Sequence, residues 1–278
     1  MKLVIRNLQV HFYNDANIIN GLNLDIDSDT LILMNSDGGK SLILRAICGL
    51  VKSSGEVLID GKPLNVKDNI VSLVLDKPVL LENKSVLKNI IFTQNVLKKD
   101  KKYINYDDIL LKFEFLANKN KKVRELTLFQ KRVLCLIRAY IKQPKILFLD
   151  DIFLNLNPDE ISKLKSYLGY FSNVCKVYTS SSVREFSDLC VNIYYVKYGR
   201  ECDMSERDLF LATNFGSMTK TTLDDVLSRF LPHVSDSEKD RVRDSVLYVD
   251  NVYYEKNDGL LYIYDGQTGD CVFKYNIN

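Results

Sequence analysis

The chain has 278 residues, which is enough for one or two domains with a sizeable hydrophobic core. Its 46% hydrophobic and 27% charged residues are ordinary for a soluble globular protein, and its formal net charge of +2 offers no bulk field for nucleic acid or anionic lipid. No apolar run approaches the roughly 18 residues of a membrane span. We therefore expect no nucleic-acid partner and no direct membrane insertion.

Hydropathy patterns in the N-terminal part predict strands, then a helix, then a hairpin. The expected elements are strands over 2–12, 18–26 and 31–34, a helix over 41–50, and a hairpin over 55–64. Asp60-Gly61 is a typical two-residue turn for that hairpin.

The middle of the chain, about 85–125, is rich in Lys and Asn and predicts helices joined by solvated loops. Its lysine-rich run at 98–102 is better explained as an exposed loop than as a binding patch. A helix is expected over 128–141, because Pro144 breaks the pattern. The next apolar run ends in Asp150 and Asp151, which is typical of a buried parallel strand.

A helix over 158–170 and a strand over 174–179 continue the alternation and favour an α/β sheet. After about residue 207 the pattern changes to an amphipathic helix over 222–230 and three short strands over 246–278. The six cysteines form no Cys-x-x-Cys pair, so we expect reduced thiols rather than a zinc site or disulfides.

The segment Asn35–Leu42 (NSDGGKSL) lies between a predicted strand and a predicted helix and contains Gly39-Lys40-Ser41. A phosphate loop has the form Gly-x-x-x-x-Gly-Lys-Ser/Thr in this context. Its backbone N–H groups would surround a β-phosphate, Lys40 would reach the β- and γ-phosphates, and Ser41 would bind Mg²⁺. Met34 stands where the first glycine belongs, so an ordinary turn before a helix is an open alternative.

Further motifs in the same order resemble the ATP-binding-cassette (ABC) ATPase family over about residues 1–207. Leu126-Thr127-Leu128-Phe129-Gln130 stands for the family's Leu-Ser-Gly-Gly-Gln signature, and Arg138-Ala139, Pro144 and Leu149-Asp150 follow at the family spacing without a gap. The resemblance implies an α/β fold with an antiparallel β subdomain, a parallel-sheet RecA-like core and a helical subdomain at about 85–143. Residues 208–278 would form a small C-terminal α+β accessory extension.

The resemblance also implies that the chain binds ATP with Mg²⁺. Asp151 falls at the catalytic glutamate, Asn157 at the D-loop aspartate and Ser180 at the switch histidine. Tyr13 falls at the aromatic residue that stacks on adenine, although Phe12 could serve and a plain strand-end aromatic is an open alternative.

The implied nucleotide-binding residues are Tyr13, Asn35, Ser36, Asp37, Gly38, Gly39, Lys40, Ser41 and Leu42. The implied metal ligands are Ser41, Asp150 and, at the Q-loop position, Asp76.

Departures from the family pattern weaken hydrolysis more than binding. Leu128 and Phe129 put bulk where glycines let a backbone approach the γ-phosphate of a facing subunit. Asp151 is one methylene shorter than glutamate, and a base misplaced by ~1 Å can cost on the order of 10²-fold. Ser180 supplies no cationic donor, and the Asp37 carboxylate would repel a polyphosphate.

The sequence therefore predicts an ATP-binding subunit of an ABC-type membrane transport complex, a weak ATPase that depends on a partner subunit. Its implied partners are a transmembrane permease subunit, which would dock over 76–92, and a second ABC ATPase subunit in a hetero- or homodimer. Such a chain would be cytoplasmic and peripheral at the inner face of a membrane. The alternative is a non-catalytic structural or regulatory ABC-fold protein. An ABC ATPase of ribosomes or DNA is disfavoured by the near-neutral charge, and a non-ABC kinase leaves residues 126–130 unexplained.

Overall fold

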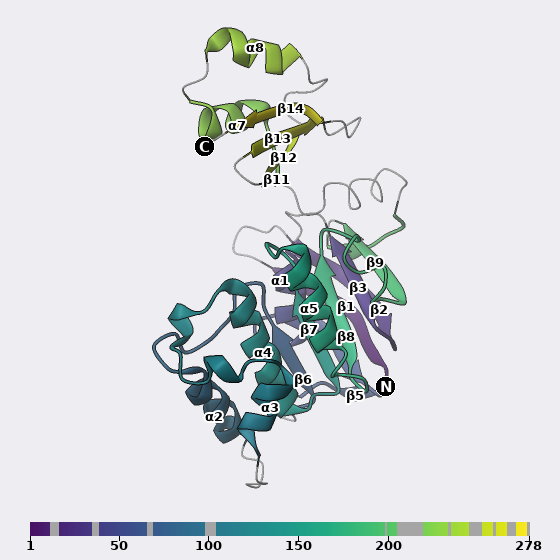
Figure 1. Ribbon diagram of the computed structural model, residues 1–278. Helices are drawn as coiled ribbons and strands as arrows, with labels where there is room; N and C mark the ends of the chain where they lie inside the picture. Colours follow the sequence, from purple (N-terminus) through teal and green to yellow (C-terminus); the bar gives the residue numbers. More distant parts are fainter. Residues whose placement is uncertain are drawn as a thin grey trace. The chain divides into compact units, whose positions relative to one another are not determined.

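The computed structural model describes residues 1–11, 17–34, 39–65, 69–97, 104–197, 199–204, 219–232, 235–244, 252–257, 260–265 and 271–276 (Figure 1). The chain forms two compact units, residues 1–180 with 185–203, and residues 181–184 with 204–278. The boundary expected at 207/208 stays a prediction. None of the described helices is long and apolar enough to cross a membrane.

An antiparallel sheet with the strand order β2-β1-β4-β5 opens the first unit. Its strands are β1 (Leu3–His11), β2 (Asn17–Ile26), β4 (Ser54–Ile59) and β5 (Lys62–Pro63). The two strands and the hairpin expected here are confirmed. Asp60 and Gly61 both have positive φ, 49° and 76°, as a type I′ turn requires.

The second sheet of this unit has the strand order β10-β9-β3-β8-β7-β6. Its strands are β3 (Thr30–Met34), β6 (Val71–Val74), β7 (Ile146–Asp150), β8 (Cys175–Ser180), β9 (Asn192–Lys197) and β10 (Arg200–Glu201). All pairings except that of β10 with β9 are parallel, and every residue of β3 and β7 is buried. The carboxyl ends of β3, β7 and β8 therefore meet at one edge, where ligands of open α/β sheets bind.

Helix α1 (Lys40–Ile47) packs between the two sheets, where Ile43 and Ile47 join one apolar core with residues of β1, β3 and β7. The helix ends before the expected residue 50, because Gly49 adopts φ 64°. The N–H of Gly49 then bonds the Ala46 carbonyl and the N–H of Leu50 bonds the Arg45 carbonyl, which is a Schellman end.

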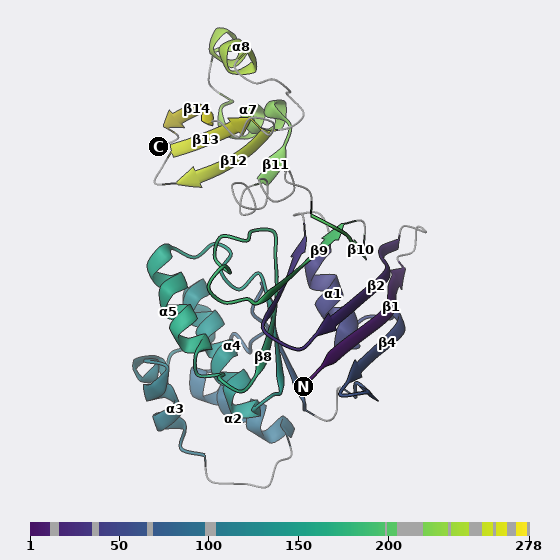
Figure 2. The same ribbon diagram turned by 90° about the vertical axis from the view of Figure 1, so that its right-hand side faces the viewer.

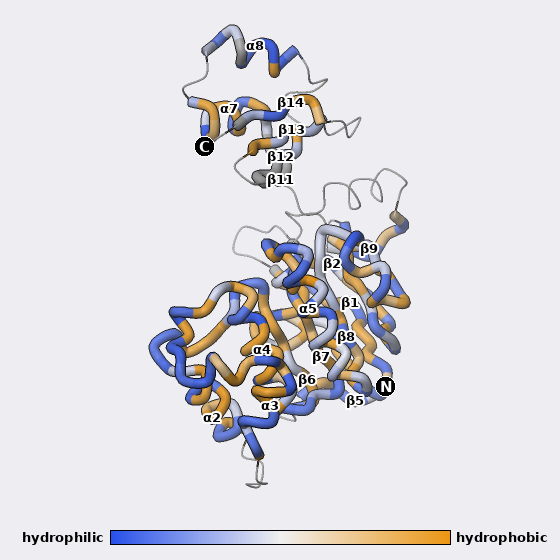
Figure 3. Tube along the Cα trace, viewed as in Figure 1, coloured by the Kyte–Doolittle hydropathy of each residue, from blue (hydrophilic) through white to orange (hydrophobic). Residues whose placement is uncertain are grey.

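The remaining helices gather on the side opposite the antiparallel sheet (Figures 1 and 2). They are α2 (Val86–Leu97), α3 (Tyr106–Lys112), α4 (Leu128–Lys142) and α5 (Pro158–Leu168), with 3₁₀ turns at Leu116–Asn118 and Val123–Glu125. Helix α4 packs against α2, α5 and β6. Figure 3 shows hydrophobic residues concentrated inside this unit and hydrophilic residues on its outer loops. The expected fold class is confirmed, whereas the lysine-rich run at 98–102 lies outside the described residues.

The second unit contains an antiparallel sheet with the order β11-β12-β13-β14. Its elements are β11 (Thr219–Thr221), α7 (Leu223–Phe230), α8 (Asp236–Asp244), β12 (Val252–Asn257), β13 (Leu260–Asp265) and β14 (Cys271–Asn276). The amphipathic helix and the three strands expected in this region are confirmed. Leu223, Val226 and Leu227 of α7 pack on Leu261 and Ile263 of β13, so this unit has an apolar core of its own.

All six cysteines are described, and none forms a disulfide. Cys202 in the first unit and Cys271 in the second are exposed.

Candidate nucleotide-binding site

The start of α1 supplies an anion-binding end at the carboxyl edge of the parallel sheet. Gly39 precedes the helix with φ 76° and ψ 31°, a left-handed conformation that favours glycine, and it gives no side-chain cap. The first N–H groups of a helix lack intrahelical acceptors, and the first turn of α1 carries no acidic residue. Backbone N–H groups and a positive helix end thus converge where the phosphate loop was predicted.

Part of the predicted loop falls outside the described residues. Tyr13, Asn35, Ser36, Asp37 and Gly38 belong to the segments 12–16 and 35–38, and their roles stay predictions. Ser41 and Leu42 lie in the first turn of α1, where both side chains are half-buried.

Lys40 forms an ion pair with Asp151, the residue after strand β7. The Lys40 Nζ lies 3.0 Å from Asp151 Oδ2, and the two side chains are only 11% and 9% exposed. Burial raises the pKa of the Asp151 carboxyl above its usual value, and the Lys40 charge offsets part of that rise. Asp151 itself has φ 41°, and its N–H donates to the Thr179 carbonyl at 3.0 Å. The backbone bond to Thr179 therefore keeps the Asp151 carboxylate beside Lys40. In the predicted phosphate loop, the same lysine would bind phosphate.

Asp150, the last residue of β7, is fully buried. Its Oδ1 accepts a hydrogen bond from Thr179 Oγ1 on the neighbouring strand at 2.7 Å. Its Oδ2 is buried and has no hydrogen-bond partner among the described residues. An unsatisfied carboxylate oxygen is costly inside a protein, and a Mg²⁺-bound water would satisfy it. Asp150 therefore fits as a residue that would hold Mg²⁺ through water, with nucleotide oxygens and further water molecules completing the coordination.

The predicted Mg²⁺ ligands include the hydroxyl of Ser41 and the carboxyl of Asp76 besides Asp150. In the described part of the chain, no group of three or more His, Cys, Asp or Glu side chains could hold a metal ion by itself. The half-buried Asp76 lies just after β6, and its carbonyl accepts a hydrogen bond from Arg132 of α4 at 3.4 Å. A metal at this edge would thus depend on phosphate oxygens for part of its coordination.

The predicted signature opens α4. Thr127 caps the helix through a capping box, because its hydroxyl accepts from the Gln130 N–H while the Gln130 side chain accepts from the Thr127 N–H. Leu126 is buried, and the side chains of Leu128 and Phe129 are half-buried. The bulk expected at the two glycine positions is therefore present at the amino end of this helix.

The predicted switch and D-loop positions lie at element ends. Ser180 is the buried last residue of β8, one residue beyond the Thr179 that bonds Asp150. Asn157 caps α5 by accepting from the Glu160 N–H at 2.9 Å. Asn157 thus has a structural role in this chain.

Sequence reasoning missed Arg132, which is 1% exposed and lies beneath the same loops. Its Nη1 donates to the Leu154 carbonyl at 2.5 Å, in the loop after β7. A signal was available, because Arg132 is spaced four residues from both Leu128 and Leu136 and so shares their inward face of the helix.

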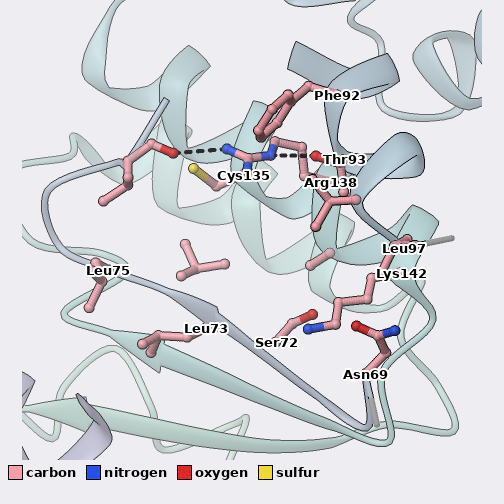
Figure 4. A pocket seen from close by; sticks show the side chains of 14 residues that line it. Asn69, Ser72, Leu73, Leu75, Phe92, Thr93, Leu97, Cys135, Arg138 and Lys142 are labelled. Atoms are coloured by element: carbon pink, nitrogen blue, oxygen red, sulfur yellow. Dashed lines mark hydrogen bonds between the residues drawn. The ribbon is translucent and has the colours of Figure 1, made fainter. Parts of the chain in front are cut away.

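A groove of about 300 Å³ lies between the edge strand β6 and helices α2 and α4 (Figure 4). Val79, Phe92 and Val96 expose 70%, 47% and 62% of their surfaces around it. Arg138 crosses the groove and donates to Thr93 Oγ1 at 2.7 Å and to the Val79 carbonyl at 2.8 Å. Of the residues that line the groove, Val79 and Phe92 lie within 76–92, where a permease contact was expected.

The parallel sheet, α1 and the carboxylates at the carboxyl end of β7 define an α/β nucleotide-binding domain of the phosphate-loop class. A model of the ABC transporter family matches residues 19–153. The methionine import ATP-binding protein MetN of Clostridium tetani is 28% identical over 72% of this chain and 68% of its own length. The phosphate import ATP-binding protein PstB of Pyrobaculum aerophilum is 29% identical over 59% of this chain and 74% of its own length. The chain is therefore similar to the ATP-binding-cassette (ABC) transporter family over its nucleotide-binding part.

The solved structure of cbiO1 from Clostridium perfringens, described as part of the ABC transporter complex cbiONQ, has the same fold. The two structures superpose with a TM-score of 0.64 at 21% sequence identity. The match covers 83% of this chain and 95% of the cbiO1 chain. An ATP-binding cassette named MJ1267, in its ADP conformation, superposes with a TM-score of 0.63 at 17% identity, over 76% of this chain and 94% of that one.

Proposed function

We propose that this chain is the ATP-binding subunit of an ABC-type membrane transport complex and that it holds Mg-ATP with impaired hydrolysis. The observation that carries the proposal is the meeting of Lys40, Asp150 and Asp151 at the start of α1. A lysine beside a helix N-terminus suits the phosphates, and a buried carboxylate oxygen without a partner suits Mg²⁺ through water. Curated relatives are named as import ATP-binding proteins, which supports the same role.

Impaired hydrolysis is supported by the side chains at the predicted catalytic, signature and switch positions. The shorter carboxylate of Asp151 is already engaged by Lys40, so it is a poor candidate for a base that orients water. The half-buried side chains of Leu128 and Phe129 crowd the signature end of α4. Ser180 offers a hydroxyl where a titrating imidazole would act. We infer that efficient turnover needs a second ABC ATPase subunit with intact motifs.

Nucleotide titration of the purified chain with and without Mg²⁺, followed by a phosphate-release assay, tests this proposal. We expect Mg²⁺-dependent binding that Lys40→Ala abolishes, with release far below ~1 s⁻¹, the lower end of ordinary enzyme turnover. Release at or above that rate by the chain alone would refute impaired hydrolysis. Absence of nucleotide binding would refute the ATP-binding role.

The permease partner is proposed from the groove beside β6. Its exposed Val79, Phe92 and Val96 form an apolar rim, with the cations Arg138 and Lys142 lining the interior. An amphipathic helix with apolar and acidic side chains fits this surface. A helix at the cytoplasmic face of a transmembrane subunit is the expected occupant, which would hold the chain peripherally at the inner face of the membrane.

Affinity purification from detergent-solubilised membranes of the native host tests the groove. We expect a hydrophobic permease to co-purify with the wild type and with Leu111→Glu, whose site on α3 is 57% exposed and lies outside the groove lining. Phe92→Glu should lose the permease. Recovery of the permease with Phe92→Glu, or of soluble partners only with the wild type, would count against the proposal.

A second candidate, a non-catalytic regulatory ABC-fold protein, is favoured by the combined changes at the signature, base and switch positions. It predicts that complex function survives Lys40→Ala. Loss of both Mg-ATP binding and transport in that variant would exclude it in pure form.

A further inference from the structure

Arg132 is a buried cation without an ion-pair partner among the described residues. It is 1% exposed, and its hydrogen bonds go to two backbone carbonyls, those of Leu154 at 2.5 Å and Asp76 at 3.4 Å. Its Nε is buried and makes no hydrogen bond within the described part of the chain. A buried guanidinium with only part of its donors satisfied is costly. Stability alone therefore does not explain an arginine here.

The two carbonyls belong to the two loops that carry the candidate Mg²⁺-binding and catalytic carboxylates. Asp76 follows β6, and Leu154 lies a few residues after Asp150, the last residue of β7, and Asp151, the first residue beyond it. Burial lowers the pKa of Arg132, and the negative charges of Asp151 and Asp76 offset part of this decrease. The guanidinium thus lies in the field of the same carboxylates whose loops it bonds.

Arg132 also belongs to the first turns of α4, two residues beyond Gln130 of the predicted signature. A planar guanidinium reaches two acceptors at once in a fixed geometry, which the single ammonium of lysine does not reproduce. One side chain thereby links the signature helix to both carboxylate-bearing loops.

We propose that Arg132 is a positioning residue that fixes the loops after β6 and β7 on α4, so that Asp76, Asp150 and Asp151 face the metal end of a bound nucleotide. The inference rests on the proposed nucleotide site. It concerns the Mg²⁺-dependent part of affinity, because the backbone N–H groups at the start of α1 belong to neither loop and stay in place to bind the phosphates. Loss of Arg132 should therefore leave phosphate binding unchanged and weaken the binding of Mg²⁺ with the nucleotide.

The variants Arg132→Lys and Arg132→Met test the link, with Lys131→Met as the matched control. Lys131 is the neighbouring cation of α4, and its ion pair with Glu82 at 3.1 Å is partly exposed. Exposed ion pairs contribute about 0–1 kcal/mol, so the control removes one charge and only a weak contact to Glu82, which lies in the loop after β6 but outside the two exchange segments measured below. Arg132→Lys keeps the charge and gives the deciding result if Arg132→Met does not fold.

The first readout needs no nucleotide. Hydrogen exchange of the free protein should be roughly tenfold faster in Arg132→Lys over residues 75–80 and 151–156, including the Leu154 amide that bonds the Asp151 carbonyl. Lys131→Met should match the wild type there. Unchanged exchange in both segments, or faster exchange across the whole unit, overturns the link even if nucleotide binds.

The second readout is the dissociation constant of a non-hydrolysable ATP analogue with and without Mg²⁺. Both Arg132 variants should bind the Mg²⁺ complex about tenfold more weakly, which is about 1.4 kcal/mol, and bind the Mg²⁺-free analogue as the wild type does. Wild-type behaviour of Arg132→Lys would show that charge alone matters, and equal losses in both conditions would show general damage; each overturns the proposal. A wild type that binds no analogue refutes the nucleotide site instead, and the exchange data still decide the link.

Discussion

Replacing Lys40 by methionine should destabilise the first unit by about 3 kcal/mol at neutral pH. Two unit charges 3.0 Å apart attract by about 5.5 kcal/mol at an effective dielectric constant of ~20, and their desolvation offsets part of this. Removing one partner of a buried pair typically costs about 3–5 kcal/mol. We take the lower end, because about a tenth of each side chain is exposed.

The penalty should shrink as the pH falls. Burial raises the pKa of Asp151 in the folded chain, so the native state binds more protons than the unfolded state between the unfolded and folded pKa values. The contribution of Asp151 to stability is therefore present at low pH and is lost as pH rises through the folded pKa. Without Lys40 that pKa rises further, and the variant regains stability at pH 5.5 relative to pH 7.5.

Urea unfolding followed by far-UV circular dichroism measures both effects in nucleotide-free buffer. With a slope of about 2–3 kcal/mol/M, the midpoint of the first unit should fall by about 1–1.5 M at pH 7.5. Asp151→Asn supplies the second arm of a double-mutant cycle, and the double variant should lose less than the sum of the singles. Strictly additive losses, or a Lys40→Met penalty that is equal at both pH values, would refute the ion-pair reasoning.

Three further substitutions probe other parts of the chain. Thr179→Val removes the donor to buried Asp150 and should cost about 1–3 kcal/mol in urea unfolding and weaken Mg²⁺-dependent nucleotide binding; unchanged stability would contradict the bond's role. Gly55→Ala places a Cβ 2.4 Å from a β1 carbonyl oxygen and should lower Tm far more than Gly61→Ala, where nothing lies within 4 Å; equal shifts would contradict the steric argument. Thr222→Ala should cost the second unit about 1 kcal/mol by loss of the α7 cap, with nucleotide binding unchanged; an effect on binding would be unexpected.

Sequence patterns predicted the first unit well where periodicity is strong. The fully buried β7 follows from a continuous apolar run, and α4 follows from its 3.6-residue pattern with Thr127 and Pro144 at its ends. The edge strand β6 (Val71–Val74) was missed because Ser72 interrupts its four residues, which therefore lack the continuous apolar run that marked 31–34. Helix α8 was missed because its nine residues are mostly charged and carry almost no apolar pattern.

The candidate site was predictable where chemistry is local in sequence. Gly39-Lys40-Ser41 and the carboxylates after β7 are each short motifs, so their spacing was enough to suggest that they meet. The direct contact of Lys40 with Asp151 and the bond from Thr179 to Asp150 depend on side-chain geometry across strands, which no linear spacing encodes. Arg132 was overlooked because arginine on a helix is usually solvated.

The exposed thiols give this chain a built-in pair of labelling positions. A maleimide dye reacts with the thiolate, and burial raises the pKa of the other four cysteines so that they react slowly. Those values are about 12 for Cys48 and Cys190 and about 11 for Cys135 and Cys175. Cys202 and Cys271 therefore allow energy transfer between one dye on each unit to be followed during nucleotide addition, with no engineered residue.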